Sequence, residues 1–521
     1  MKAMLRCTTA MVLILLLLGG IFLTSAEASS NSTRPPITAT DISSPNIVTD
    51  YKGFTNLVYL FDKQTFWYLD AYGPAHLTLS HEAGIGSLYI MFAKKSDIYT
   101  LTDEDTGKTV DCGQYGFLHD FVDVEALFGY TPKKLTISFT NWSTVIRELY
   151  VFTSGEVPSF VQKWEPPAEG ETDIALFSTH SDDEHLFFLG ILPYYTQELG
   201  YNVQVVYLTD HHNTGGAQRQ YEALMGLWNV GVRNYPIWGT CPDYLEDSAY
   251  MTYAMLEVYG VTRENLLEFV TKQVRRLKPK VAIGHDFNGE YGHGQHMVYA
   301  ELLAEASERS ADPKFYPDSA DKYGVWDIPK TYFHLYNENP IVMDWDQPLK
   351  SFGGMTAYEV SITKGFTWHD SQYADFVWYF RGYETAASIL EYNPCHYGLY
   401  RTTVGPDVNK NDFFENLTTH AEDQAAAAEA ERIAKEQAEA EAQRLAEEER
   451  ARKEAEERER IKAEAEASAK AEAEALAEKQ RLATEEAYKI HIIVLYGIIV
   501  VLLLTVIYLT SKLSKKRNKK D

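Results

Sequence analysis

Apolar strand-like runs and longer helix-like runs alternate over residues 172–418, and this alternation limits the possible folds more than any other feature of the chain. The strand-like runs are 173–178, 202–208 and 280–284. The helix-like runs are 184–198, 216–230 and 263–277. Strands that alternate with helices of this length are typical of βαβ units, which build a parallel sheet with helices on its faces. We therefore predict an α/β domain with a Rossmann-like parallel sheet over 172–418.

Polar turns that contain histidines follow two of these strand-like runs. Residues 180–184 read His-Ser-Asp-Asp-Glu, and residues 291–296 read Tyr-Gly-His-Gly-Gln-His. Because α/β folds place their sites at the carboxyl ends of the strands, we expect the two turns to converge. Two histidines and one aspartate supply three zinc ligands and leave one position for water, whereas a structural zinc site uses four protein ligands. A second aspartate beside them can act as a general base.

The order and the separation of the two turns resemble the PIG-L/LmbE family of zinc-dependent de-N-acetylases. Segment 180–184 is similar to the family's His-Pro-Asp-Asp-Glu signature, and segment 291–296 is similar to its later Gly-His-x-x-His motif. The resemblance covers residues 172–418. It implies a zinc-dependent N-deacetylase with an LmbE-like fold.

The resemblance implies that His180, Asp183 and His296 bind the zinc ion, and that Asp182 is the general base for the attacking water. Physical chemistry agrees with this division of roles. Adjacent residues in an extended turn point in different directions, so Asp183 can face the metal while Asp182 faces the water. Zinc lowers the pKa of a bound water toward ~7 and polarises a carbonyl group. One carboxylate can then carry a proton from the water to the leaving amine.

Three further residues receive roles from the resemblance. His293, either positively charged or hydrogen-bonding, would stabilise the oxyanion. Tyr291 would help to polarise the acetyl carbonyl. Arg219 lies in segment 215–222, which resembles the family's Arg-x-x-Glu segment, and it would contact the sugar.

Two positions depart from the family pattern. Ser181 replaces the usual proline, which loosens the turn but removes no ligand. Gln295 replaces an aspartate that is often found inside the His-x-x-His motif. A carboxylate that would tune a histidine is therefore an amide here, so the metal affinity or the pKa of His293 can differ from that of relatives.

Other interpretations of these residues remain open. A His-x-Asp-Asp sequence can also begin a helix, with one aspartate capping the free amides. His211 and His212 follow another strand-like run, and they either border the site or form an exposed loop pair. Segment 368–372, Trp-His-Asp-Ser-Gln, resembles a later family segment of the form His-x-Ser-Gln and is a candidate for lining the pocket.

The sequence thus predicts a zinc-dependent hydrolase that removes an acetyl group from an N-acetylated amino sugar. Sites with two histidines and one aspartate also accept other divalent ions. One alternative is a carbohydrate-binding surface protein without activity. A second alternative is an amidase that acts on another sugar conjugate, such as a sugar-thiol or a lipid conjugate. The sequence indicates neither the glycan nor an oligomeric state.

The N-terminal segment has the pattern of a signal for export. Lys2 and Arg6 precede the apolar run 11–23, and the small-x-small sequence 26–28 offers a cleavage site. Residues 1–28 are therefore predicted to be a signal peptide, with an uncleaved membrane anchor as the alternative. Residues 29–48 are rich in Ser, Thr, Pro and Asn and are predicted to be a flexible lead-in.

Residues 49–165 are predicted to form a β-sandwich domain. Short aromatic and β-branched runs punctuated by Gly, Asp and Asn lie at 56–61, 75–79, 87–93, 134–140 and 148–152. This pattern is typical of sandwiches and loosely resembles galactose-binding-like domains. Tyr68, Tyr72 and Trp142 either stack on sugar rings or pack in the core and at strand edges.

Residues 421–488 consist mainly of Ala, Glu, Lys, Arg and Gln, and they contain no Gly or Pro. These residues are the strongest helix formers, and many opposite charges lie three or four positions apart, where they can pair. Large apolar residues are too sparse for a strong coiled coil. We predict a helical stalk, either solitary or weakly packed through alanines, with a disordered charged spacer as the alternative.

A transmembrane helix is predicted at 490–510. Residues 492–510 carry no charge, and such a run is long enough to span a bilayer. The basic tail 511–521 is expected to stay in the cytoplasm. Together with the signal peptide, this predicts a single-pass protein of the cell membrane whose N-terminal domains are extracellular.

Charge and cysteine usage limit the possible partners and crosslinks. The formal net charge is −26, so a surface this acidic would repel the phosphates of nucleic acid. Besides Cys7, the chain contains only Cys112, Cys241 and Cys395, without any metal-binding spacing. Export permits a disulfide between Cys241 and Cys395. Free buried thiols are the alternative.

Overall fold

The computed structural model describes residues 37–140 and 143–517. The predicted signal peptide at 1–28 and Trp142 lie outside these described residues. The chain divides into two compact units, one up to Glu422 and the other from Asp423 onward. Each unit is described by itself.

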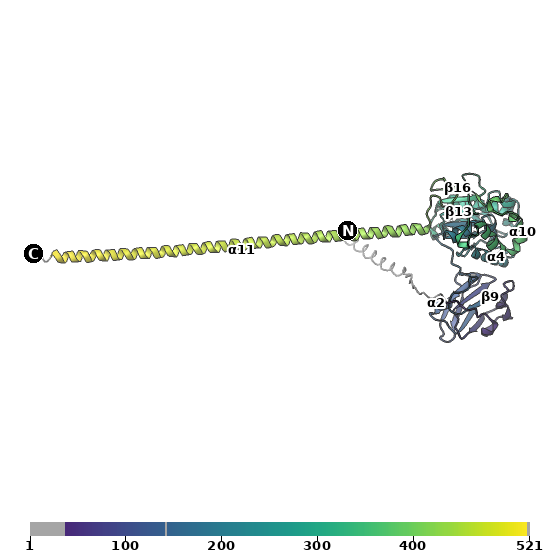
Figure 1. The fold of residues 1–521 in the computed structure, drawn as a ribbon, viewed down its shortest axis with the longest axis horizontal. Helices are drawn as coiled ribbons and strands as arrows, with labels where there is room; N and C mark the ends of the chain where they lie inside the picture. The colour runs from purple at the N-terminus through teal and green to yellow at the C-terminus, as the bar shows by residue number, and fades with distance from the viewer. Residues whose placement is uncertain (1–36, 141–142, 518–521) are drawn as a thin grey trace. The chain divides into compact units, whose positions relative to one another are not determined.

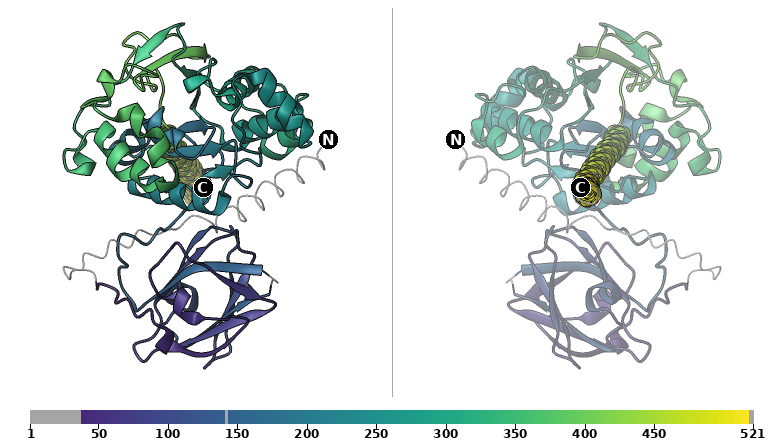
Figure 2. Two further views of the ribbon diagram at one scale, coloured as in Figure 1. Left: turned by 90° about the vertical axis from the view of Figure 1, so that its right-hand side faces the viewer. Right: turned by 90° about the vertical axis from the view of Figure 1, so that its left-hand side faces the viewer.

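The N-terminal part of the first unit contains two antiparallel sheets (Figure 2). The five-stranded sheet has the order β1 (Val48–Lys52), β3 (Ala75–Ser80), β8 (Lys134–Phe139), β5 (Tyr99–Asp103) and β6 (Thr109–Cys112). The four-stranded sheet has the order β2 (Leu69–Tyr72), β9 (Ser143–Phe152), β4 (Ser87–Phe92) and β7 (His119–Asp123). Apolar residues of both sheets, including Leu77, Leu101, Ile90 and Leu149, are buried in one core.

Short helices flank these strands: η1 (Pro45–Ile47), η2 (Leu57–Leu60) and α2 (Val124–Phe128). The run 56–61, predicted as a strand, is instead the helix η2. The reason is local, because the Asn56 side chain accepts a hydrogen bond from the Val58 amide and caps the turn. Asparagine favours such caps over extended strands.

The second part of this unit is built on a seven-stranded sheet. Its order is β12 (Ile237–Trp238), β11 (Val203–Tyr207), β10 (Ile174–Ser178), β13 (Val281–Gly284), β14 (Lys330–His334), β16 (His396–Thr402) and β15 (Pro340–Val342). The first five strands are parallel, but β16 runs antiparallel to both β14 and β15. The prediction of a parallel sheet is therefore right for the centre and wrong for one edge, where the sheet is mixed. Antiparallel strands of this kind are common at the edges of α/β sheets.

Helices cover both faces of this sheet. Its helices, with the short 3-10 and π turns labelled η, are α3 (Asp183–Leu186), η3 (Pro193–Glu198), α4 (Gly216–Asn229), α5 (Ala249–Val258), α6 (Arg263–Leu277), η4 (Glu290–Gly292), α7 (Gly294–Arg309), α8 (Pro317–Tyr323), η5 (Lys350–Phe352), α9 (Ala357–Val360), η6 (Ser361–Gly365), η7 (Phe366–Trp368), α10 (Asp370–Phe380) and η8 (Ala386–Ser388). Ala175 and Phe177 of β10 pack with α6 and α7, whereas Ile174 and Leu176 pack with α3 and α4. This alternation follows from the two-residue repeat of a strand.

The predicted helix 263–277 is confirmed as α6, and local chemistry explains its ends. Thr262 and Asn265 form a capping box at its start, and Lys278 adopts a left-handed conformation after its end. The predicted helix 184–198 is wrong as a single element. It is divided into α3 and η3, because Pro193 cannot donate to the preceding turn.

Hydrogen bonds and ring contacts join the N-terminal sheets to the α/β part. Arg147 of β9 donates to the carbonyl of Ala217 at the start of α4. Tyr221 of α4 donates to the Thr65 hydroxyl. The Tyr235 ring stacks on Phe117 at a centroid distance of 4.4 Å. The N-terminal sheets therefore contact the α/β part at helix α4 and at Tyr235.

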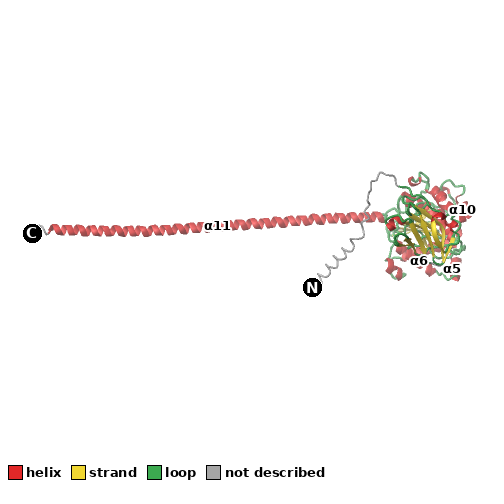
Figure 3. Ribbon diagram, turned by 90° about the horizontal axis from the view of Figure 1, so that it is seen from below, coloured by secondary structure: helices red, strands yellow, loops and turns green. Residues whose placement is uncertain are grey.

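The C-terminal residues form one helix, α11 (His420–Arg517), which Figures 1 and 3 show as a continuous rod. It includes both 421–488 and 490–510. Pairs such as Arg432 with Glu436 lie one turn apart, as the sequence predicts. Among the described residues, it is the one helix long and apolar enough to cross a membrane, by length and composition.

The cysteines at 112, 241 and 395 are buried free thiols. The structure thus has no disulfide between Cys241 and Cys395, and the alternative of free buried thiols is the one that it supports.

Candidate metal centre

The histidine-bearing turns meet at the carboxyl edge of the central strands. His180 follows β10, His285 follows β13 and His211 follows β11. His293 and His296 lie at the start of α7, which follows β13 after a short turn. The strand order places β10 between β11 and β13, so the turns after these three strands are neighbours. The structure thus brings the two motifs together, as the sequence predicts.

Three donor atoms lie close together at this edge. Asp183 Oδ2 is 3.3 Å from His180 Nδ1 and 3.3 Å from His296 Nε2. The two histidine nitrogens are 3.1 Å apart. Around a tetrahedral ion with bonds of about 2.0–2.1 Å, neighbouring ligand atoms are separated by about 3.3 Å. The donor set and its spacing therefore fit a zinc-sized divalent ion, and these residues could hold a metal.

The charges around these atoms favour a cation. Burial by itself would lower the pKa of His296, but the Asp183 carboxylate reverses this effect and raises it to about 9. Burial would likewise lower the pKa of His180, yet Asp243 and Asp183 hold it well above its usual range. A negative potential that stabilises a proton on these rings also attracts a metal ion, which must displace those protons when it binds.

A second layer of polar groups fixes the rings. Glu290 accepts from three imidazoles, with His285 Nδ1 at 2.8 Å, His296 Nδ1 at 2.7 Å and His334 Nδ1 at 2.6 Å. The bond to His296 Nδ1 leaves Nε2 free to face Asp183. Asp183 Oδ2 also lies 3.5 Å from His285 Nε2.

Gln295 and Asp243 orient His180 in the same way. His180 Nε2 lies 3.1 Å from Gln295 Oε1 and 3.3 Å from Asp243 Oδ1, so its proton belongs on Nε2 and Nδ1 faces the donor cluster. The Gln295 amide in turn donates to the Pro242 carbonyl, which fixes which end is oxygen. The substitution of glutamine at 295 therefore keeps an acceptor beside His180.

A pocket of about 310 Å³ opens beside the cluster. The lining residues are His180, Asp182, Arg219, Asp243, Leu245, Tyr291, His293, Gln372, Asp375 and Phe376. The predicted catalytic residues Asp182, Tyr291 and His293 and the predicted sugar-binding residue Arg219 all line this pocket. One predicted metal ligand, His180, lines it as well. Asp183 and His296 lie behind it, buried.

Asp182 does not cap the helix that follows it. Its side chain makes no capping hydrogen bond, and its Oδ2 instead lies 3.3 Å from Arg219 Nη2. Its backbone adopts a φ of 143°, a strained value for a residue with a side chain. The Asp182 amide donates to Glu184, and Arg219 donates to the Ser181 carbonyl, so hydrogen bonds on both sides hold this turn.

Electrostatics separate Asp182 from Asp183. Burial raises the pKa of Asp182 to about 7, against the opposing effect of Arg219. Burial would also raise the pKa of Asp183, but His296 and His180 hold it well below its usual range. One carboxyl group can thus exchange a proton near neutral pH while its neighbour stays ionised.

The surroundings of His293 favour its neutral form. Burial, together with the positive charges of His180 and His296, lowers its pKa to about 2. Its Nδ1 accepts from the Gln295 amide, which leaves Nε2 to carry the proton. Of the two predicted forms of His293, these contacts favour the hydrogen-bonding one.

Several contributors were not assigned from the sequence. Glu290 and Asp243 received no role, although both are buried or nearly buried against the histidines. Asp243 could not be found from motifs because it lies far from both. His211 borders the site and contacts Ser181 and Asp243, whereas His212 is exposed. Of the two histidines in this loop, His211 borders the site and His212 is an exposed loop residue, so each fits one of the two alternatives.

Replacement of Glu290 with glutamine should weaken metal binding. The amide can no longer balance three imidazoles, and the loss of a carboxylate behind a ligating histidine typically costs about 10- to 100-fold in metal affinity. Competition with a chromophoric zinc chelator measures this change. The exposed Glu257→Gln variant is the matched control, and equal affinities in the two variants would contradict the role of Glu290.

Comparisons with known proteins give relatives for part of the α/β domain. Residues 175–307 match the family described as "PIG-L: GlcNAc-PI de-N-acetylase". The chain is 28% identical over 143 residues to 1D-myo-inositol 2-acetamido-2-deoxy-alpha-D-glucopyranoside deacetylase 1 of Catenulispora acidiphila, which covers 27% of this chain and 43% of that protein. The corresponding deacetylase of Streptomyces scabiei is 28% identical over 142 residues, covering 27% of this chain and 36% of that protein. The chain thus spans less than half the length of these two relatives.

Solved structures give weaker likenesses. One is N,N'-diacetylchitobiose deacetylase from Pyrococcus horikoshii, at 16% identity and a TM-score of 0.25 over 42% of this chain and 82% of that chain. Another is the 4-carboxy-2-hydroxymuconate hydratase GalB from Pseudomonas putida, at 16% identity and a TM-score of 0.28 over 46% and 99%. Scores this low support no statement about function. The sequence match over residues 175–307, which runs from β10 to α7 and contains both histidine motifs, identifies a PIG-L domain within the α/β part of this chain.

Proposed function

We propose that this chain is a metal-dependent hydrolase that removes the acetyl group from an N-acetylated amino sugar. One observation carries the proposal: Asp182, with a pKa near neutrality, lines the same pocket as His180, whose other side faces Asp183 and His296. The names of the relatives, deacetylases of an N-acetylglucosamine-type sugar, support the choice of an acetamide as the bond that is cleaved.

The roles of the residues follow from their positions. A divalent ion held by His180, Asp183 and His296 would supply Lewis acidity for the acetyl carbonyl and the water, and we propose zinc because nitrogen and oxygen donors at this spacing suit it. Asp182 takes a proton from the attacking water and delivers it to the leaving amine. Burial raises the pKa of Asp182 to about 7 and Arg219 opposes this rise, so that part of the Asp182 population is ionised near neutral pH.

His293 and Tyr291 act on the oxygen of the acetyl group. The Nε2 proton of neutral His293 donates a hydrogen bond to the developing oxyanion. Burial and the charges of Asp183 and Asp182 hold the pKa of Tyr291 well above its usual range, so its phenol stays a donor. A second hollow of about 600 Å³, which shares Leu245, Tyr291 and His293 with the pocket, gives room for sugar units beyond the acetylated one. Arg219 contacts the sugar with the face that Asp182 leaves free.

Replacement of Asp182 with asparagine should abolish most of the activity while the metal stays bound. An amide cannot accept the proton of water, and loss of a general base typically costs about 10²- to 10⁴-fold in rate. The measurement is acetate release by the full chain in detergent from a panel of N-acetylglucosaminyl glycans, with zinc content determined in parallel. Asp318→Asn on the surface of α8 is the matched control.

Unchanged acetate release by Asp182→Asn would rule out this role for Asp182. Release of a different acyl group, or release only from a sugar-thiol or lipid conjugate, would favour the amidase alternative, and mass spectrometry of the products separates the two. Binding of glycans without any release by the wild-type chain would favour a carbohydrate-binding protein.

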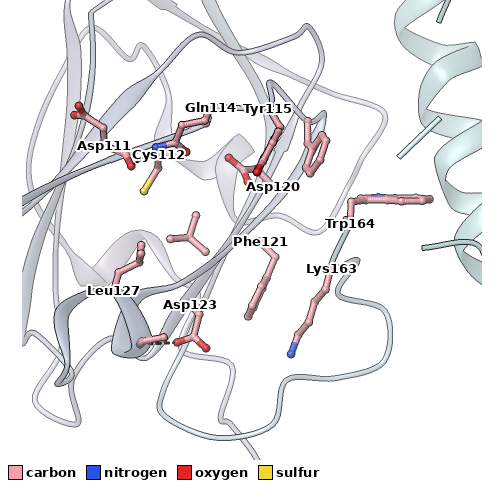
Figure 4. Close-up of a pocket in the computed structure, with 14 residues that line it drawn as sticks. Asp111, Cys112, Gln114, Tyr115, Asp120, Phe121, Asp123, Leu127, Lys163 and Trp164 are labelled. Carbon is pink, nitrogen blue, oxygen red and sulfur yellow. Dashed lines mark hydrogen bonds between the residues drawn. The ribbon is translucent and has the colours of Figure 1, made fainter. Parts of the chain in front are cut away.

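A binding role for the N-terminal β domain is a second proposal, because this domain has a suitable cavity. We propose that the β domain holds a glycan in a cavity of about 340 Å³ beside β6, β7 and α2 (Figure 4). The carboxylates of Asp111, Asp120 and Asp123 line it and can accept from sugar hydroxyls. Tyr115 at its rim is 61% exposed, and its ring stacks on Phe117. An exposed, rigid aromatic face is the kind of surface against which sugar rings pack.

Tyr115→Ala should weaken glycan binding by the full chain at least several-fold, because it removes the aromatic face of the cavity. Binding is measured by affinity electrophoresis or calorimetry with the glycan that is deacetylated. Tyr68→Ala removes an aromatic ring that is similarly exposed, at 55%, outside the cavity, and it is the matched control. A loss of binding in Tyr68→Ala but not in Tyr115→Ala would contradict the cavity and favour the exposed aromatic surface.

The location of the protein is also a proposal. We propose that α11 is a stalk over 421–488 and a membrane anchor over 490–510, with the enzyme outside the cell and the basic tail inside. The apolar, uncharged run 492–510 and the cluster of lysines after it support this orientation.

Protease added to intact cells should digest the α/β domain and spare an epitope fused after Asp521, because the membrane shields the cytoplasmic side. Detection of both parts by immunoblotting measures this. Digestion of the C-terminal epitope in intact cells, with the α/β domain protected, would reverse the proposed orientation. Digestion of neither part would contradict an external enzyme.

A further inference from the structure

A second cluster of histidines and a carboxylate lies inside the α/β domain, apart from the pocket. Glu184 and His185 belong to α3, and His369 precedes α10. All three side chains are fully buried, and none of them lines the pocket beside His180. Neither the proposed mechanism nor the proposed sugar binding uses His185 or His369.

The polar atoms of this cluster lack hydrogen-bond partners among the described residues. Both ring nitrogens of His185, both ring nitrogens of His369 and Glu184 Oε1 are buried without a partner at hydrogen-bonding distance and angle, although the Tyr207 hydroxyl lies close enough to Glu184 to interact with its carboxyl group. Buried polar groups are nearly always paired, so two complete imidazoles and a carboxylate oxygen that share this property at one place require an explanation. Single unpaired atoms occur elsewhere among the described residues, but here three of them, Glu184 Oε1 and the Nε2 atoms of both histidines, face one another.

The spacing suits ligands of an ion better than mutual hydrogen bonds. Glu184 Oε1 lies 3.6 Å from His185 Nε2 and 3.6 Å from His369 Nε2. Nitrogen–oxygen hydrogen bonds are typically about 2.7–3.2 Å long. Two ligand atoms that each lie about 2.0–2.1 Å from a common ion are about 3.3–3.6 Å apart at angles between tetrahedral and trigonal. The three donors all lie within 4.8 Å of one another.

Two glycines keep this place open. A Cβ atom on Gly226, in the last turn of α4, would lie 2.8 Å from His185 Nε2, 3.0 Å from the Gly365 carbonyl oxygen and 3.2 Å from His369 Nε2. A Cβ atom on Gly365 would collide with the His185 ring. Glycine inside a helix is unfavourable, so Gly226 is best explained by the close approach of α4 to these two nitrogens.

We propose that Glu184, His185 and His369 bind a second divalent transition-metal ion, through Glu184 Oε1 and the Nε2 atoms of both histidines. Two imidazoles and one carboxylate are a donor set that suits zinc and its neighbours in the first transition row. Because none of the three residues lines the pocket, this ion would take no part in the proposed hydrolysis, and with three protein ligands its fourth position would be left to a water molecule. The other oxygen of Glu184 accepts from the Asp182 amide at 2.8 Å, so the ion would also fix the strained turn that positions Asp182.

Metal stoichiometry tests the proposal without any use of activity. The full chain in detergent is stripped with a chelator, equilibrated with zinc chloride and analysed by mass spectrometry of the metal. We expect two zinc ions per wild-type chain, one in His369→Gln and one in His296→Gln, and none in the double variant. One zinc per wild-type chain, fully retained in His369→Gln and lost in His296→Gln, would overturn the proposal.

A crystal of the wild-type chain decides the question if a variant does not fold. An anomalous peak at the zinc edge between Glu184, His185 and His369 would support the second site. A peak only at His180, Asp183 and His296 would overturn it while leaving the proposed function intact.

Discussion

One carboxylate oxygen organises the functional edge of the α/β domain. Asp183 Oδ2 accepts the backbone amide of His180 at 2.8 Å and lies within 3.5 Å of nitrogen atoms on His180, His285 and His296. It is the point at which the turn after β10 and the turn after β13 are joined. Removing this charge would take away the one carboxylate oxygen that lies between the facing nitrogens of His180 and His296, and breaking a buried ion pair is among the more costly defects in a protein interior.

Carboxylates outside this centre divide the histidines among different tasks. Glu290 holds three rings from behind, and Asp243 holds His180 and His211. His293 has no such partner, and burial among positive rings keeps it neutral. In the proposed mechanism, the same residue type would therefore serve as a metal ligand where a carboxylate supports it, as at His180 and His296, and as a hydrogen-bond donor at His293. The turn at Asp182 is held by Glu184 and Arg219, so the proposed base depends on both.

The sequence predicted the elements that have simple, local causes. Strands β10, β11 and β13 follow from apolar runs, and α6 follows from its apolar spacing and its capping residues. The prediction failed where a single residue outweighs the pattern. Asn56 caps η2 where a strand was expected, and Pro193 divides the helix expected over 184–198. The antiparallel pairing of β16 with β14 was not predicted, because the hydrophobic pattern of a strand does not indicate which distant strand it pairs with.

The two histidine motifs and their convergence were determined by the sequence alone, because strand ends in a parallel sheet must share one edge. The helical character of 421–488 was also expected from the sequence, because it consists of helix formers without Gly or Pro, whereas the structure alone shows that this segment and 490–510 form one helix, His420–Arg517. Only the tertiary structure decided which carboxylate supports each histidine. Glu290 and Asp243 reach the site by folding of the chain, and burial, which sets the pKa values of Asp182 and His293, exists only once the surrounding elements have packed. The cluster of Glu184, His185 and His369 is of the same kind, because His369 reaches α3 only through the packing of the loop that precedes α10.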